Sequence, residues 1–97
     1  MKRSLSDTTT ITATDHQIST TVSGETVILD SQGGMYYSLD NVGAFIWSLI
    51  QEPTQVGKSR AAVLETYEVS AEQLEQDLTT LLNELAEAGL VEIRGEA

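Results

Sequence analysis

Few side chains in this sequence have the chemistry that catalysis or metal binding requires. His16 is the only histidine, and the chain contains no cysteine. A lone histidine does not make a zinc site without cysteines or carboxylates around it, so we interpret His16 as a surface residue. The lack of cysteine also excludes disulfides and reactive thiols. We therefore expect no metal site, no cofactor and no catalytic residues.

The remaining candidates for chemistry have simpler structural explanations. Asp30 and Asp40 are the carboxylate pair that most resembles an acid–base arrangement. They flank a short strand-like segment, where turns and helix N-caps commonly use aspartate. Gly33 and Gly34 form no phosphate-binding loop, because no helix follows them in a βαβ unit. We interpret all four residues as structural and the chain as a non-enzyme.

The charge of the chain restricts its partners. The 15 acidic and 5 basic side chains give a net charge of -10. Such a charge opposes binding to phosphate backbones and anionic membranes, and it favours neutral or basic peptides. No apolar run approaches the length that spans a bilayer, and no signal-peptide core follows Lys2 and Arg3. We expect a cytoplasmic protein without a nucleic-acid or membrane partner.

Residues 16–39 have the pattern of a three-stranded antiparallel meander. Its turns contain glycines, which adopt positive φ readily. In the third strand, residues 35–39, Tyr36 and Tyr37 must face opposite sides because side chains alternate along a strand. Only one of them can be a core residue. This aromatic strand is a candidate for accepting another strand at its edge.

After Leu39 the apolar residues change to a helical period. Asp40 or Asn41 is a plausible N-cap for a first helix, and Pro53 ends this element or opens the next. The apolar stripe of this helix consists of Val42, Phe45, Ile46, Leu49 and Ile50, with Trp47 at its edge. We expect Phe45 and Trp47 to serve the core rather than a ligand.

Two further helices follow. A weaker stripe predicts the second helix over residues 56–67. Ser70 and Gln73 have the spacing of a capping box that begins the third helix. Gly89 is well placed to end it. The apolar residues of 90–93 then form a short closing strand or a packed tail.

The third helix carries two different faces. One flank mixes apolar and acidic residues, namely Leu74, Asp77, Leu81, Glu84 and Ala88. Beyond it, toward the core, lie Leu78, Leu82 and Leu85. A mixed flank of this kind is either the ordinary boundary between core and solvent or the wall of a peptide groove.

This order of elements predicts an α+β, winged-helix-like domain, with a three-stranded antiparallel sheet followed by three helices. We assign the domain to residues 16–93. Residues 1–15 are rich in Ser and Thr, and we expect a flexible N-terminal segment there rather than a short strand over residues 8–12. Residues 94–97 are expected to be a tail.

Two segments resemble the PqqD-like family, whose domain is also called the RiPP recognition element. They are ETVILDSQGGMYYSLDNVGAFIWSLI, residues 25–50, and YEVSAEQLEQDLTTLLNELAEAGLVEI, residues 67–93. The likeness is strongest to the stand-alone leader-binding proteins of lasso peptide biosynthesis. The family often has Asp-Gly after the first helix, where this chain has Glu52-Pro53-Thr54, and the second helix fits the family loosely.

The resemblance implies a non-catalytic peptide chaperone. The leader peptide of a ribosomally made precursor would add as a strand beside the third strand, in the groove that this strand forms with the third helix. The implied binding residues are Met35, Tyr36, Tyr37, Ser38 and Leu39 on the strand, and Leu74, Asp77, Leu78, Leu81 and Glu84 on the helix. The implied partners are a cysteine protease that removes the leader and an ATP-dependent cyclase that resembles asparagine synthetase.

Three alternatives remain. The protein could serve a radical enzyme or another RiPP-modifying enzyme instead. It could be a winged-helix DNA-binding protein, but residues 71–88 contain no Lys or Arg for a recognition surface. It could also be an acidic subunit with a purely structural role.

Overall fold

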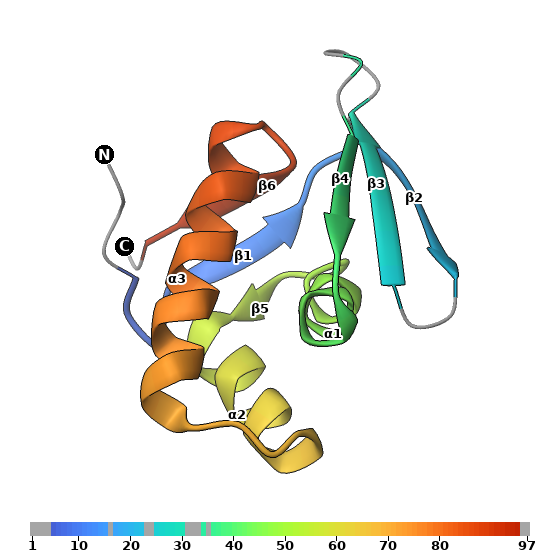
Figure 1. Cartoon of the computed structure of the whole chain (residues 1–97). Coiled ribbons are helices and arrows are strands. Elements are labelled where there is room, and N and C mark those ends of the chain that lie inside the picture. The colour runs from blue at the N-terminus through green and yellow to red at the C-terminus, as the bar shows by residue number, and fades with distance from the viewer. Residues whose placement is uncertain (1–4, 16, 23–24, 31–33, 35, 96–97) are drawn as a thin grey trace.

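The computed structural model describes residues 5–15, 17–22, 25–30, 34 and 36–95. The expectations for His16, Gly33 and Met35 concern residues outside this set. In chain order the elements are β1 (Thr10–Ala13), β2 (Gln17–Val22), β3 (Glu25–Asp30), β4 (Tyr36–Leu39), α1 (Asn41–Leu49), β5 (Thr54–Gln55), α2 (Val56–Thr66), α3 (Ala71–Glu87) and β6 (Val91–Arg94). Figure 1 shows α3 on one side of the molecule and the β2–β3–β4 sheet on the other.

The predicted meander is present as an antiparallel sheet in the order β2-β3-β4. Its central strand alternates, with Thr26 and Ile28 buried and Val27 and Leu29 exposed. The sheet therefore has one face toward the core and one toward solvent, as antiparallel sheets commonly do. The α+β class with a three-stranded antiparallel sheet followed by three helices is confirmed.

A second sheet, in the order β5-β1-β6, was not predicted as such. Its central strand β1 pairs Ile11 with Ile93 on one side and with Thr54 on the other, and Ile11 is fully buried. Residues 10–13 thus differ from the expected flexible segment. They pair with strands more than forty residues away in sequence. Patterns within a short stretch of sequence cannot predict such distant pairings. The closing strand at residues 90–93 is present as β6, which also includes Arg94 from the expected tail.

The first helix begins as predicted at an aspartate cap. The Asp40 side chain accepts a hydrogen bond of 2.9 Å from the backbone N–H of Gly43. This satisfies one of the N–H groups that a helix leaves free in its first turn. The helix ends before Pro53, and α2 begins directly after the two-residue strand β5.

The third helix has the predicted ends. Ser70 Oγ accepts a hydrogen bond of 3.0 Å from the Gln73 backbone N–H. The Gln73 side chain, however, donates to Asp77 one turn later, at 2.9 Å. At the other end Gly89 has a φ of 78°, the left-handed conformation that glycine adopts without strain. The chain then turns back from α3 into β6.

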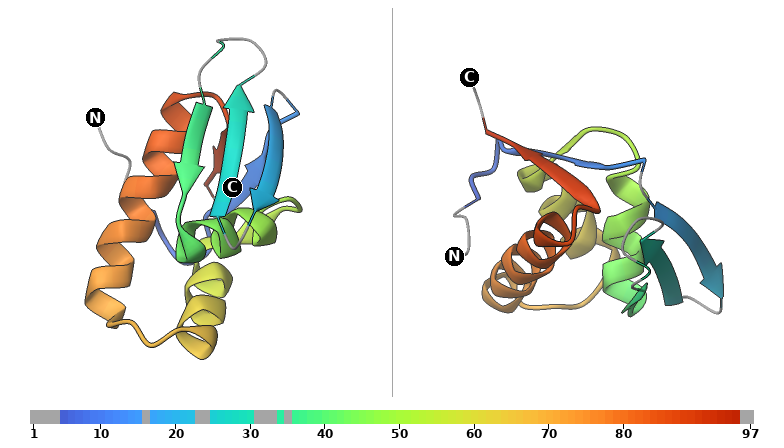
Figure 2. Two further views of the ribbon diagram at one scale, coloured as in Figure 1. Left: turned by 45° about the vertical axis from the view of Figure 1, so that its right-hand side comes forward. Right: turned by 90° about the horizontal axis from the view of Figure 1, so that it is seen from above.

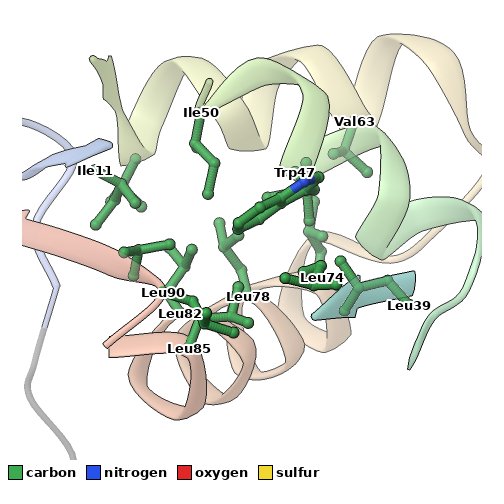
Figure 3. Close-up of a cluster of buried hydrophobic side chains, with 14 residues drawn as sticks. Ile11, Leu39, Trp47, Ile50, Val63, Leu74, Leu78, Leu82, Leu85 and Leu90 are labelled. Atoms are coloured by element: carbon green, nitrogen blue, oxygen red, sulfur yellow. The ribbon is translucent and has the colours of Figure 1, made fainter. Parts of the chain in front are cut away.

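One hydrophobic core joins both sheets and all three helices (Figure 3). Trp47 of α1 is 3% exposed, and its Nε1 donates to Ser19 Oγ of β2 at 3.2 Å. Phe45 is only half-buried and meets the ring of Tyr67 edge-on, with the centroids 5.5 Å apart. The buried cluster includes Ile11, Ile28, Leu39, Ile46, Trp47, Ile50, Val56, Val63, Leu74, Leu78, Leu82, Leu85, Leu90 and Val91. Trp47 and Phe45 therefore pack as core residues, as predicted.

Replacing Trp47 by alanine is expected to lower the free energy of unfolding by about 3–5 kcal/mol, because it removes a buried aromatic side chain and leaves a cavity. The same change at the half-buried Phe45 should cost less. Urea unfolding followed by circular dichroism measures both losses. Equal and small losses at the two positions would contradict this description of the core.

Candidate functional site

A groove of about 440 Å³ lies between α3 on one side and β4 with the start of α1 on the other. In the left view of Figure 2, α3 and β4 occupy the upper part of the molecule, with α1 and α2 below them. The lining residues are Ser38 and Leu39 of β4, the cap residue Asp40, Val42, Gly43 and Ile46 of α1, Val69 of the α2–α3 connection, and Gln73, Leu74, Asp77, Leu78 and Leu81 of α3. Strand, helix and connection thus contribute to one concave surface.

The α3 wall combines apolar depth with a polar rim. Leu74 and Leu78 are buried, with 3% and 1% of their surface exposed. Leu81 is half-buried and Asp77 is exposed. The spacing of three and four residues places these side chains on one side of the helix. An apolar side chain that entered the groove would contact the leucines, while its backbone could stay near the polar rim.

The β4 wall ends in an unpaired strand edge. Within the described residues, β4 pairs with β3 alone, in a register that sets Tyr37 opposite Ile28 and Ser38 opposite Val27. Along an antiparallel strand, alternate residues direct their N–H and C=O groups toward opposite neighbours. Part of the β4 backbone is therefore free to bond with an added strand, and an edge of this kind invites pairing.

Six of the predicted binding residues line the groove: Ser38, Leu39, Leu74, Asp77, Leu78 and Leu81. Tyr36 and Glu84 are exposed, Tyr37 packs against the core, and none of the three lines the groove. Met35 is outside the described residues. Sequence reasoning did not assign Asp40, Val42, Gly43, Ile46, Val69 or Gln73 to the site, because it explained most of them as caps or core. Val69 could have been found from the sequence, because an apolar residue in the connection between two helices had no assigned structural role.

The groove has an acidic character. Asp40 and Asp77 are among its lining residues, and none of the described lining residues is a lysine or arginine. Each carboxylate already accepts one hydrogen bond within the chain, from Gly43 N–H and from the Gln73 side chain respectively. Since the whole chain is also strongly acidic, the groove favours a neutral or basic occupant.

The described residues hold no cluster of three or more histidine, aspartate or glutamate side chains placed to bind a metal. Among them the Ser59 hydroxyl is buried without a hydrogen-bond partner, and a serine nucleophile needs an adjacent base. No helix in this part of the chain is long and apolar enough to cross a membrane.

The solvent face of the β2–β3–β4 sheet carries a second feature, which we call the outer patch: Ile18, Val27, Leu29 and Tyr36. The sheet register aligns Ile18, Leu29 and Tyr36 in one row across the three strands. Their exposed fractions are 65%, 43% and 71%, and that of Val27 is 39%. Four large apolar side chains gathered on one exposed face are typical of an interaction surface.

Comparisons with known proteins agree with this geometry. The solved structure of TbiB1 in complex with the TbiA(beta) leader peptide matches with a TM-score of 0.76 and 35% sequence identity, covering 89% of this chain and 98% of TbiB1. A lasso peptide synthetase B1, complexed with its leader peptide, matches with a TM-score of 0.72 and 21% identity, covering 84% of this chain and 96% of that one. The latter likeness shows the fold. Curated protein sequences give no significant match.

The sequence profile of the family described as coenzyme PQQ synthesis protein D (PqqD) matches residues 25–91. This range runs from the start of β3 to the first residue of β6, and it contains all the described residues that line the groove. The match spans well over half of the chain, and TbiB1 is similar over nearly its full length. The chain belongs to the PqqD family.

Proposed function

We propose that this protein binds the leader peptide of a ribosomally synthesised precursor, most directly a lasso peptide precursor, by strand addition to β4. The observation that carries the proposal is the unpaired edge of β4 facing the apolar wall of α3 across a groove. Support comes from the two similar structures, both of which are complexes with leader peptides. Strand addition is a general mode of peptide recognition, in which backbone bonds supply affinity and side-chain pockets supply specificity.

The size of the site is consistent with useful affinity. Each backbone hydrogen bond contributes about 0.5–1.5 kcal/mol net. A few such bonds along the four residues of β4 would add to apolar contacts with Leu74 and Leu81. After the free-energy cost of ordering the peptide is subtracted, these contributions correspond to a dissociation constant in the micromolar to nanomolar range.

In this proposal the protein is a cytoplasmic chaperone that catalyses nothing itself. It delivers the bound precursor to a leader-removing cysteine protease, after which an ATP-dependent cyclase closes the ring. Service to a radical enzyme or another RiPP-modifying enzyme is the alternative within the same family. A short precursor gene and a small protease gene beside this one would distinguish the two.

The outer patch is the surface that we propose for the protease. It is separate from the groove, because none of Ile18, Val27, Leu29 and Tyr36 lines the groove. It is also continuous with β4, so that a protein docked there would lie next to a leader paired with the strand edge. Contact with a second copy is less favourable, since each chain carries a charge of -10.

Replacing Ile18 by glutamate should leave leader affinity unchanged within about twofold and slow leader removal by the partner protease at least about tenfold, because a charge enters an apolar contact. Ala61→Glu adds the same charge on the exposed side of α2, outside the outer patch and the groove, and serves as the matched control. The rate of leader cleavage by the protease, measured at subsaturating concentrations of each variant, compares the two substitutions. A normal cleavage rate with Ile18→Glu would show that the protease does not bind the outer patch.

Proline at Tyr37 or Ser38 should weaken leader binding at least about tenfold. Proline lacks the backbone donor, and its ring restricts φ. Neighbouring residues of β4 point their N–H groups to opposite sides, so one variant disturbs the free edge and the other disturbs the pairing with β3. The edge variant should remain folded, because edge strands tolerate proline. If both variants bind the leader with full affinity, the leader does not pair with β4.

Leu81→Lys should weaken leader binding about tenfold or more, since it places a charge in the apolar part of the groove. Asp77→Lys at the rim and Glu84→Lys outside the groove should have smaller effects that salt screens. Isothermal titration with leader peptide and with duplex DNA measures these affinities. The unmodified protein should show no DNA binding at physiological salt. Tight DNA binding would instead support the winged-helix DNA-binding alternative.

A further inference from the structure

The segment before β1 caps the start of α2. Gln55, the N-cap residue of this helix, makes no side-chain hydrogen bond to it. Instead the backbone N–H of Val56 donates to the carbonyl of Thr9 at 2.9 Å. The backbone N–H of Gly57 donates in the same way to the carbonyl of Asp7, also at 2.9 Å. These bonds satisfy two of the N–H groups that a helix leaves free in its first turn.

Gly57 allows Asp7 to lie directly against α2. A Cβ atom at position 57 would lie 3.0 Å from the Asp7 Cβ. This distance is shorter than the roughly 3.5–4.0 Å at which carbon atoms attract each other most strongly, so a larger residue would require Asp7 to shift. Arg60 follows three residues later on the same side of the helix, and its guanidinium bonds to the Asp7 carboxylate.

Arg60 also connects this segment to α3. One nitrogen of its guanidinium donates to Asp7, and the other donates to Glu75 of α3 at 2.8 Å. The arginine side chain is only 18% exposed, whereas both carboxylates are more exposed. A single exposed ion pair contributes little to stability. A planar guanidinium that donates to two carboxylates at once, however, fixes the position of both segments relative to α2.

Glu75 lies in the part of α3 that forms the groove wall. It directly follows Leu74 and precedes Asp77 by two residues, and both of these line the groove. The other end of the helix leads into β6, which packs against α3. The bond between Arg60 and Glu75 restrains the first half of the helix before any peptide is bound. A wall that is already in place lowers the free-energy cost of ordering on binding.

We propose that Arg60 is a positioning residue for leader binding, and that the N-terminal segment around Asp7 belongs to the binding unit. The inference rests on the proposed function and extends it to residues remote from the groove, since neither Arg60 nor Asp7 is among the described lining residues. Arg60 acts through Glu75, whose helix supplies one wall. Asp7 acts through Arg60, although it lies outside residues 25–91, which match the family profile.

A second arginine in the structure allows a matched comparison. Arg94 pairs with Glu92 at 3.2 Å on β6, where both side chains are exposed. Arg60→Gln and Arg94→Gln remove the same charge, so a general electrostatic effect on the leader would appear in both. The probe is a synthetic peptide with the leader sequence of the precursor encoded beside this gene. In isothermal titration Arg60→Gln should weaken its binding about threefold to tenfold, and Arg94→Gln should leave it unchanged within about twofold.

Further measurements separate positioning from a loss of stability. Circular dichroism should show that each variant is folded at the titration temperature. In the free protein, amides of residues 74–78 should exchange faster in Arg60→Gln than in Arg94→Gln, because the start of α3 has lost a bond to α2. Arg60→Lys should bind the leader with intermediate affinity, since a compact ammonium lacks the planar fork that spans two carboxylates.

Asp7→Ala tests whether the N-terminal segment acts through the arginine. It should weaken leader binding at least about twofold, and it should cause no further loss in combination with Arg60→Gln. Additive losses from the two substitutions would contradict the inference. Because the Asp7 side chain is exposed, this variant also decides the matter if Arg60→Gln does not fold, and unchanged affinity would then overturn the inference.

The remaining outcomes distinguish this inference from the proposed function. If Arg60→Gln binds the leader as tightly as Arg94→Gln does, while proline in β4 still weakens binding, this inference is wrong and the proposed function stands. If the unmodified protein binds no leader peptide, both are wrong.

Discussion

The free edge of β4 is the constraint on which the rest of the site depends. β4 pairs with β3 on one side, and directly after Leu39 the chain enters α1 through the Asp40 cap. The chain therefore supplies no further strand to pair with β4 among the described residues. An edge left open in this way usually leads to aggregation unless it is covered or used. Here it borders a groove whose other wall is a helix.

The opposite wall, α3, packs into the core through its buried leucines and is also tied to other parts of the molecule at both ends. At its start, Glu75 bonds to Arg60 of α2 at 2.8 Å, and the same arginine pairs with Asp7 before β1. At its end, the turn at Gly89 leads into β6, which pairs with β1. The second sheet thus contributes to the site without lining it, because its strand β6 packs against α3.

Local signals in the sequence predicted a large part of this structure. Alternation predicted the meander, helical periods predicted α1 and α3, and side-chain chemistry predicted the caps at Asp40 and Ser70. The strand β1 was not favoured, because its burial at Ile11 depends on partners that are distant in sequence. Val69 was not assigned to the groove for a related reason, since a residue between helices acquires its neighbours only when the helices pack.

Amide hydrogen exchange of the protein with and without leader peptide tests the central claim most directly. If the leader adds to β4, amides of Tyr36–Leu39 that point away from β3 should become protected on binding, while those that already bond to β3 change little. Protection should also increase on the groove side of α3. The opposite result would be new protection along β2 and none along β4 when the protein is saturated with leader. That result would contradict strand addition to β4.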